Sequence, residues 1–261
     1  MNNHGIESFK SVISEVCEIS REISIRYFKK SASELALQSK SDASPVTIAD
    51  LTIEEKIRKL ITDKFPEHGI VGEEQGVFNE NAEWIWTVDP IDGTKSFITG
   101  VPLFTTLLAL SYQGNPVAGL IYQPILDELV WGDNQTTFFN GKQAQMRSQS
   151  KLADATLLTT DIVHIGEYHS FKNFEALMQK TRFTRTWGDG YGYLLLATGN
   201  ADIMIDPVMN PWDLLALIPV IQGAGGVITS WDGQLATNGK SIVAASRDLH
   251  PLVIHQLNSK N

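Results

Sequence analysis

Two carboxylates lie three residues apart in the segment 84–97, W-I-W-T-V-D-P-I-D-G-T-K-S-F. Residues 84–88 are apolar, aromatic or β-branched, which predicts a buried strand with Asp89 at its C-terminal end. We expect Pro90 to end the strand, and Asp92 and Gly93 to turn the chain into a short helix. A helix N-terminus attracts phosphate, whereas paired carboxylates repel it unless cations lie between them. The segment therefore favours Mg²⁺ with phosphate, and an ordinary strand followed by an Asp-Gly turn is the structural alternative.

Further acidic residues stand at expected strand ends and helix starts, and these are Asp50, Glu73, Glu74 and Asp213. Each has a structural alternative. Adjacent glutamates are commonly solvated surface charges, Asp50 resembles the last residue of a capping box that begins at Thr47, and Asp213 would interact favourably with a helix dipole. Hard oxygen ligands and no soft one are supplied by Glu73, Asp89, Asp92, Asp213 and Thr94, which favours Mg²⁺ over zinc.

The elements expected around these residues change in character near residue 145. Before it we predict two amphipathic helices and a largely antiparallel sheet. The first helix has its apolar stripe over residues 6–27, and the second starts at 47–50 and has its stripe over 53–61. After it strands and helices alternate: strands near 156–160, 201–205, 227–230 and 242–245, and helices near 171–180, 189–196 and 211–221. We therefore predict an N-terminal α+β half, residues 1–145, with most metal ligands, and a C-terminal α/β half, residues 146–261, with Asp213 and the substrate pocket. The two halves form one compact unit.

The composition excludes several classes of partner. With 261 residues, 43% of them hydrophobic, the chain can bury a full core. Its net charge of -9 argues against nucleic acid or an anionic membrane as partner, because both require a basic patch. No apolar run reaches the ~20 residues of a membrane span and no signal-peptide pattern is present, so we expect a cytoplasmic protein. The single Cys17 cannot form an internal disulfide and falls on the apolar stripe of the first helix.

Three ordered motifs resemble those of the inositol monophosphatase family, and together they extend over nearly the whole chain. They are G-E-E at 72–74, D-P-I-D-G-T at 89–94, and P-W-D-L-L-A at 211–216 followed by G-A-G-G at 223–226. The resemblance implies an α+β or α/β fold, specifically a layered αβαβα sandwich, and commonly a homodimer. It also implies Mg²⁺-dependent hydrolysis of a phosphate monoester, with two to three ions in each active site.

The resemblance assigns roles to individual residues. Glu73, Asp89 and the backbone carbonyl of Ile91 would bind a first metal ion, while Asp89, Asp92 and Asp213 would bind a second. Asp50 and Thr94 match a carboxylate–hydroxyl dyad that orients or deprotonates the attacking water, with Glu73 also part of the catalytic set. The backbone N–H groups of Gly93 and Thr94 would bind phosphate. Glu74 would support the ligands or hold a third, weaker ion, and Lys40 would screen the phosphate entrance.

The substrate expected from the resemblance is a small phosphate ester. K-S-F-I-T-G-V-P after the aspartate motif, and W-G-D-G-Y-G-Y-L-L-L-A-T-G at 187–199, are most similar to the histidinol-phosphatase branch of the family. Histidinol phosphate carries an ammonium and an imidazole, so nearby carboxylates favour it. Asp189 is the first candidate to bind it, with an N-terminal helix cap as the alternative; Arg185 and Asn210 are lesser candidates beside Lys40 and Asp213. Inositol 1-phosphate and 3'-phosphoadenosine 5'-phosphate are alternative substrates, and a non-catalytic metal- or phosphate-binding protein is the alternative of another class.

Overall fold

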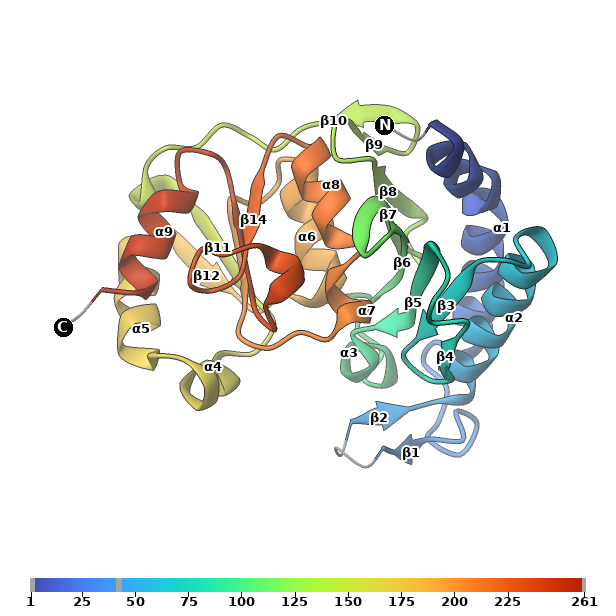
Figure 1. The fold of residues 1–261 in the computed structure, drawn as a ribbon. Coiled ribbons are helices and arrows are strands. Elements are labelled where there is room, and N and C mark those ends of the chain that lie inside the picture. The colour runs from blue at the N-terminus through green and yellow to red at the C-terminus, as the bar shows by residue number, and fades with distance from the viewer. Residues whose placement is uncertain (1–2, 41–43, 260–261) are drawn as a thin grey trace.

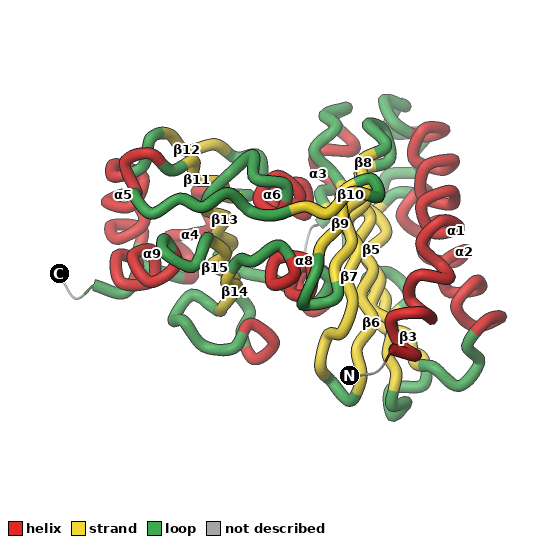
Figure 2. Tube along the Cα trace, turned by 90° about the horizontal axis from the view of Figure 1, so that it is seen from above, coloured by secondary structure: helices red, strands yellow, loops and turns green. Residues whose placement is uncertain are grey.

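Helices and sheets alternate in five layers in the computed structural model, which describes residues 3–40 and 44–259. A pair of helices covers an eight-stranded sheet, two further helices separate this sheet from a five-stranded sheet, and helices close the far side (Figures 1 and 2). This order of layers confirms the αβαβα sandwich expected from the sequence.

The first layer consists of α1 (Asn3–Tyr27) and α2 (Ile48–Lys64), which pack against each other and against the eight-stranded sheet. Apolar residues three or four apart form one buried stripe on each helix, as the periodicity predicts. Phe9, Val12 and Val16 are fully buried on α1, as are Ile53 and Ile57 on α2. Between the helices, β1 (Gln38–Ser39) pairs with β2 (Pro45–Val46).

The eight-stranded sheet positions the acidic strand ends. Its strands are β3 (Gly69–Gly72), β4 (Gly76–Phe78), β5 (Trp84–Asp92), β6 (Thr105–Tyr112), β7 (Asn115–Gln123), β8 (Glu128–Gly132), β9 (Thr137–Phe139) and β10 (Lys142–Ala144), in the order β10-β9-β8-β7-β6-β5-β3-β4. Neighbouring strands are antiparallel except β3 and β5, which are parallel with Gly72 opposite Val88. Because parallel strands end at the same edge of a sheet, Glu73 and Asp89 follow this pair side by side.

The expectation that Pro90 ends the strand is wrong. Strand β5 continues to Asp92, and its pairing with β6 shifts register between Asp89 and Asp92. Pro90 lies within this irregularity, where its missing N–H disrupts no regular ladder, and its carbonyl accepts a hydrogen bond from Thr106 Oγ1 at 2.7 Å. The short helix α3 (Thr94–Ile98) follows at once.

The five-stranded sheet carries the second part of the chain. It contains β11 (Thr156–Thr159), β12 (Phe183–Arg185), β13 (Ile203–Asp206), β14 (Val227–Thr229) and β15 (Ile242–Ala245), in the order β12-β11-β13-β15-β14. Strands β12, β11 and β13 are parallel, whereas β15 runs antiparallel to both of its neighbours. The remaining helices are α4 (Ile162–Tyr168), α5 (Phe171–Lys180), α6 (Asp189–Ala197), α7 (Pro211–Leu214), α8 (Leu217–Gly223) and α9 (His250–Leu257), with 3-10 turns at Leu152–Asp154 and Ala236–Asn238.

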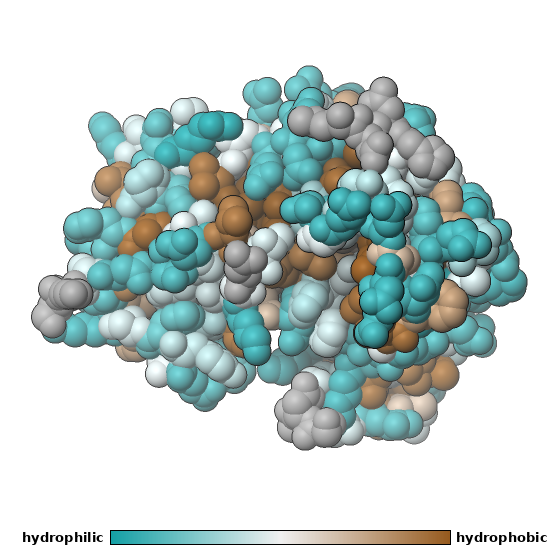
Figure 3. Space-filling view, viewed as in Figure 1, coloured by the Kyte–Doolittle hydropathy of each residue, from teal (hydrophilic) through white to brown (hydrophobic). Residues whose placement is uncertain are grey.

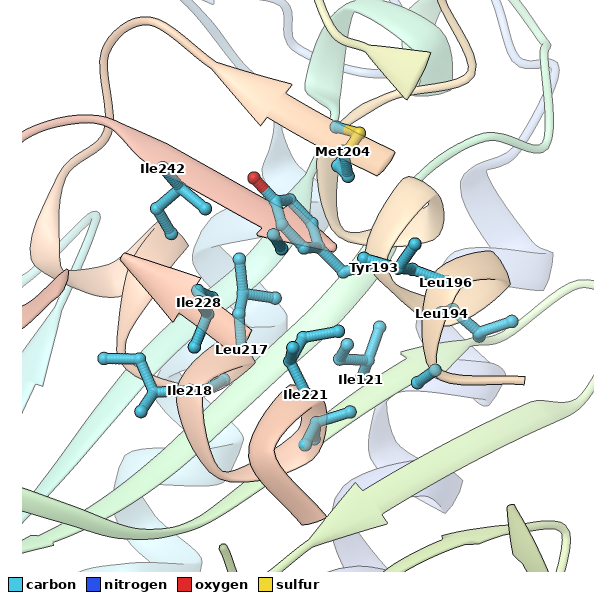
Figure 4. Close-up of a cluster of buried hydrophobic side chains, with 14 of the residues drawn as sticks. Ile121, Tyr193, Leu194, Leu196, Met204, Leu217, Ile218, Ile221, Ile228 and Ile242 are labelled. Atoms are coloured by element: carbon cyan, nitrogen blue, oxygen red, sulfur yellow. The ribbon is translucent and has the colours of Figure 1, made fainter. Parts of the chain in front are cut away.

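A continuous apolar core joins the two sheets. Ile121 of the first sheet, Tyr193 and Leu196 of α6, Leu217 of α8 and Met204 of the second sheet belong to one buried cluster (Figure 4). The first sheet ends at β10 and the second begins at β11, so the predicted boundary at residue 145 falls in the connection between them. The division into two halves within one unit stays a prediction.

The surface agrees with the acidic, polar composition, since hydrophilic residues cover much of the face in Figure 3 and apolar residues show between them. Among the described residues, no helix has the length and apolar character required to cross a bilayer. Cys17 is half-buried and unpaired, and burial, then the charge of Asp127, raises the pKa of its thiol to about 12. Cys17 is therefore held as the protonated thiol at neutral pH.

Candidate active site

Three carboxylates converge where β5 meets α7. One carboxylate oxygen from each of Asp89, Asp92 and Asp213 lies within 4.8 Å of the others. Asp89 is buried, and its Oδ1 has no hydrogen-bond partner in the described part of the chain. An orphaned, buried carboxylate oxygen within an all-oxygen donor set fits a hard divalent cation such as Mg²⁺.

Glu73 adjoins this cluster from the end of β3, where its backbone N–H donates to the carbonyl of Val88 at 3.2 Å. Burial raises the pKa of Asp89 well above its ordinary value, and the charges of Glu73, Asp92 and Asp213 raise it further. Burial likewise raises the pKa of Asp213 to about 6. Four carboxylates thus repel one another in a poorly solvated place, and a bound cation would relieve this repulsion.

Asp50 serves α2 and the site at once. Its Oδ2 accepts hydrogen bonds from the Thr47 backbone N–H at 2.9 Å and the Thr47 hydroxyl at 2.5 Å, which completes the predicted capping box. Its Oδ1 lies 3.4 Å from the hydroxyl of Thr94, and this hydroxyl also donates to the Ile91 carbonyl at 3.0 Å. Asp50 therefore makes both contacts expected from the sequence: the capping contact with Thr47 and the contact with Thr94.

Asp213 is held in the same manner. Its Oδ2 accepts a hydrogen bond from the backbone N–H of Asn210 at 2.8 Å and from the Asn210 side chain at 3.3 Å. Asn210 is the N-cap of α7, and Pro211 occupies the first turn, where its missing N–H costs nothing. In this structure Asn210 positions a carboxylate of the cluster.

A glycine is required at position 93, because the side chain of Asp189 and the backbone at Leu103 both approach it closely. Its φ is +90°, and a Cβ there would lie 2.9 Å from Asp189 Oδ2 and 2.9 Å from the carbonyl of Leu103. Only glycine fits this space and this backbone conformation. Gly93 starts α3 beside the cluster, and phosphate binding by the N–H groups of Gly93 and Thr94 stays a prediction.

Lys40 joins the two glutamates after β3. Its ammonium lies 2.7 Å from Oε1 of both Glu73 and Glu74. Burial acts to lower the pKa of Lys40, but hydrogen bonds to these two carboxylates outweigh burial and raise it. Burial also raises the pKa of Glu74 to about 7. Lys40 therefore neutralises charge on the Glu73 side of the cluster.

A cavity of about 140 Å³ opens beside Asp92 and Asp213. Its other lining residues are Thr160, Asp161, His164, Asp189, Asp206, Pro207, Val208 and Met209. Three of them carry carboxylates in addition to those of the cluster. Sequence reasoning found only Asp189 of these three. It missed Asp206, although I-M-I-D-P at 203–207 repeats the pattern of a buried strand ending in Asp-Pro that drew attention to Asp89.

Asp189 stands in a strained conformation at the first residue of α6, with a φ of +50°. The N-cap is Gly188, so Asp189 does not cap the helix. Its N–H donates to Thr160 Oγ1 at 2.9 Å, whereas its carboxylate accepts no hydrogen bond from any described residue. Burial, then the charges of Asp206 and Asp213, raise its pKa to about 7. A strained residue with an unpartnered carboxylate in a cavity indicates a functional constraint.

Arg185 lies outside this arrangement. Its side chain is exposed, its guanidinium lies 5.2 Å from the ring centre of Phe183, and its Nη1 donates to the Thr184 carbonyl. It does not line the cavity. Its contribution to substrate binding therefore stays a prediction.

Known proteins match the chain throughout its length. The sequence model described as the inositol monophosphatase family matches residues 6–261. The bifunctional phosphatase IMPL2, chloroplastic, of Arabidopsis thaliana is 40% identical over 98% of this chain and 77% of its own length. The histidinol-phosphatase of Chlorobaculum parvum is 35% identical over 89% of this chain and 90% of its own.

Inositol phosphatases are similar to the chain as well. The inositol-1-monophosphatase of Caulobacter vibrioides is 33% identical over 86% of this chain and 91% of its own length. A solved inositol monophosphatase from Zymomonas mobilis superposes with a TM-score of 0.85 at 32% identity, covering 97% of this chain and 98% of that one.

Proposed function

Because the chain belongs to the inositol monophosphatase family, whose members hydrolyse phosphomonoesters with Mg²⁺, we propose that its substrate is L-histidinol phosphate. The cavity carries this proposal. It presents Asp161, Asp189 and Asp206 next to the metal-binding cluster, and a substrate with an ammonium and an imidazole supplies positive charge to such a surface.

The unpartnered carboxylate of Asp189 favours a cationic substrate over a neutral one. A hydroxyl of a neutral ring donates a hydrogen bond to a carboxylate but leaves its negative charge uncompensated, whereas an ammonium donates a hydrogen bond and also brings a positive charge. Relatives named histidinol-phosphatase, such as the one from Chlorobaculum parvum, are consistent with this choice. A role in histidine biosynthesis follows from the same proposal.

The residues of the cluster divide between two ions in the proposed arrangement. Glu73, Asp89 and the Ile91 carbonyl would hold the first ion, and Asp89, Asp92 and Asp213 would hold the second. A third ion near Glu74 would bring the number to two to three. When bound, Mg²⁺ supplies an activated water and stabilises charge on the leaving oxygen.

The chain's own contribution to the reaction is positioning and proton transfer. Asp50 holds Oδ1 toward the Thr94 hydroxyl, and together they orient the attacking water and accept its proton. The raised pKa of Asp50, about 6 mainly because of burial, suits a base that acts near neutral pH. The N–H groups of Gly93 and Thr94 bind phosphate, and Lys40 screens its entrance.

Phosphate release from histidinol phosphate, inositol 1-phosphate and 3'-phosphoadenosine 5'-phosphate tests the proposal. We expect the largest kcat/KM for histidinol phosphate with Mg²⁺ and no turnover with chelator. Hydrolysis of inositol 1-phosphate far faster than histidinol phosphate would reject it. Inositol-1-monophosphatase is the second candidate, because relatives of that name match nearly the whole chain.

The alternative hypothesis, a non-catalytic protein whose acidic cluster only binds metal or phosphate, predicts a different result. Asp50→Asn would leave its function intact, whereas the phosphatase loses turnover with its fold retained. Homodimer formation and a cytoplasmic location stay predictions, which sedimentation and fractionation of cells would test.

A further inference from the structure

Helix α4 contributes two polar side chains to the cavity, Asp161 and His164. Asp161 is the N-cap residue, and its Oδ1 accepts a hydrogen bond from the Val163 N–H at 2.8 Å. Its Oδ2 lies 3.2 Å from Nδ1 of His164. One carboxylate thus fixes both the start of α4 and the orientation of the imidazole ring.

The contact with Asp161 leaves one ring nitrogen of His164 available. Nδ1 faces the Asp161 carboxylate, which favours a proton on that nitrogen, so we assign Nε2, on the other side of the ring, as the acceptor. Nε2 has no hydrogen-bond partner among residues 3–40 and 44–259. The side chains of His164 and Asp161 are 41% and 37% exposed, so they are accessible from the cavity.

The positions of Asp189 and α4 order the cavity from the phosphate outward. Asp189 Oδ2 adjoins Gly93, and the next residue, Gly190, donates its N–H to Asp92 Oδ2, so Asp189 lies at the phosphate end. In histidinol phosphate the carbon with the ammonium is one methylene from the ester oxygen, and the imidazole lies one further methylene away. The ammonium therefore falls near Asp189 and the imidazole beyond it.

We propose that His164, oriented by Asp161, recognises the imidazole of the substrate by accepting its N–H at Nε2. Pro207, Val208 and Met209 supply the apolar lining against which the flat ring packs. The inference rests on the proposed function, and it adds to it the residues that distinguish histidinol phosphate from other cationic phosphate esters.

Matched substrates and variants separate this contact from the others. Histidinol phosphate is compared with alaninol phosphate, which keeps the phosphate and the ammonium but lacks the imidazole. His164→Ala should raise KM for histidinol phosphate about three- to tenfold, the effect of one hydrogen bond, with a much smaller change in kcat. The KM for alaninol phosphate should rise far less, because this ester has no imidazole to contact His164.

Two further variants act as controls for α4. Asp161→Asn keeps a good N-cap but releases the orientation of His164, so it should give part of the same selective loss. Val163→Ala changes a side chain that is 74% exposed on the same helix and does not line the cavity. It should leave the preference between the two esters unchanged.

Equal losses on both esters, or none on either, would overturn the inference. Calorimetric binding of histidinol, the product, separates this failure from failure of the proposed function. If the wild type prefers inositol 1-phosphate, the proposed function fails, but tighter histidinol binding to the wild type than to His164→Ala still supports the subsite. The absence of such a difference overturns it.

Discussion

Two sets of buried aspartates occupy the strand ends of this protein, and they differ in their hydrogen-bond partners. Asp202 accepts hydrogen bonds from the Arg147 guanidinium and from the Thr156 N–H at 2.6 Å, and Asp206 accepts from the Tyr193 hydroxyl at 2.8 Å and the Thr160 N–H at 3.1 Å. Asp89, by contrast, buries an oxygen to which no described residue donates a hydrogen bond. The oxygens of the first set accept hydrogen bonds from the chain itself, whereas the orphaned oxygen of the second set fits a cation from solution.

The largest effect should come from the oxygen without a partner. Asp89→Asn removes the charge shared by both proposed ions, so turnover should fall by about 10³-fold or more, equivalent to about 4 kcal/mol. The fold should persist, because amide replaces carboxylate at similar volume and loses the repulsion. Phosphate release and thermal unfolding with and without Mg²⁺ measure both results. If Mg²⁺ raises the Tm of Asp89→Asn as much as that of the wild type, Asp89 is not a ligand.

The paired set should respond in the opposite way. Asp202→Asn weakens the hydrogen bonds of the Arg147 guanidinium, and the loss should be about 2 kcal/mol, because the remaining charge on Arg147 is 42% exposed and stays solvated. Urea unfolding should show this loss, while kcat and the Mg²⁺ requirement of the folded protein stay unchanged. A variant that is as stable as the wild type but depends less on Mg²⁺ would show that Asp202 acts with the metal-binding carboxylates and does not stabilise the fold.

Asp50 combines a structural contact with Thr47 and a proposed catalytic contact with Thr94. Two substitutions separate these roles. Asp50→Asn and Asp50→Ala should each lose about 10²-fold in kcat, because neither accepts a proton. Asp50→Ala should also lose about 1 kcal/mol of stability, because it no longer bonds to Thr47. Parallel measurements of phosphate release and urea unfolding test this. If the two variants are equally stable, the capping contact contributes nothing measurable.

The last expected effect is a pH dependence of the metal-free protein. The pKa values of Asp50 and Asp213 are raised from 3.8 to about 6, and that of Asp189 to about 7, in each case chiefly by burial. The folded state therefore binds more protons than the unfolded state between about pH 4 and 7, and stability is lost as pH rises through this window.

Urea unfolding in chelator should thus give a lower free energy at pH 7.5 than at pH 5. For each extra proton that the folded state holds, the free energy of unfolding should fall by about 1.4 kcal/mol per pH unit. Saturating Mg²⁺ should flatten the slope, because ligands of a cation are ionised. Asp213→Asn serves as a control with a shallower slope in chelator. A free energy that rises with pH in chelator would show that the cluster is not strained without metal.

Local signals explain why much of the fold could be predicted. Helix α5 has the bounds expected from its periodicity, Phe171–Lys180, and the capping box at Thr47 starts α2 as expected. The elements expected from the sequence do not include helix α4, strand β12 or helix α9. Strand β12 has only three residues, α4 lacks a clear apolar stripe, and α9 is fixed by tertiary contacts with α5 and β15.

The site shows the same limit. Its metal-binding carboxylates fall within short motifs, so the sequence identifies them, but the cavity depends on which strands become neighbours. Parallel pairing places Thr159 of β11 opposite Ile205 of β13, and this pairing brings the start of α4, with Asp161 and His164, beside Asp206. No local pattern encodes a pairing between segments so far apart in the chain.

The left-handed backbone of Asp189 makes the loss of this carboxylate easier in evolution than its retention. Glycine at this position would relieve about 1 kcal/mol of strain, and one base change converts an aspartate codon into a glycine codon. Mutation and the gain in stability therefore both act against the carboxylate, and under the proposed function selection for the substrate preserves it. Lineages released from that selection should drift away from cationic esters while they retain the metal-binding cluster and the fold.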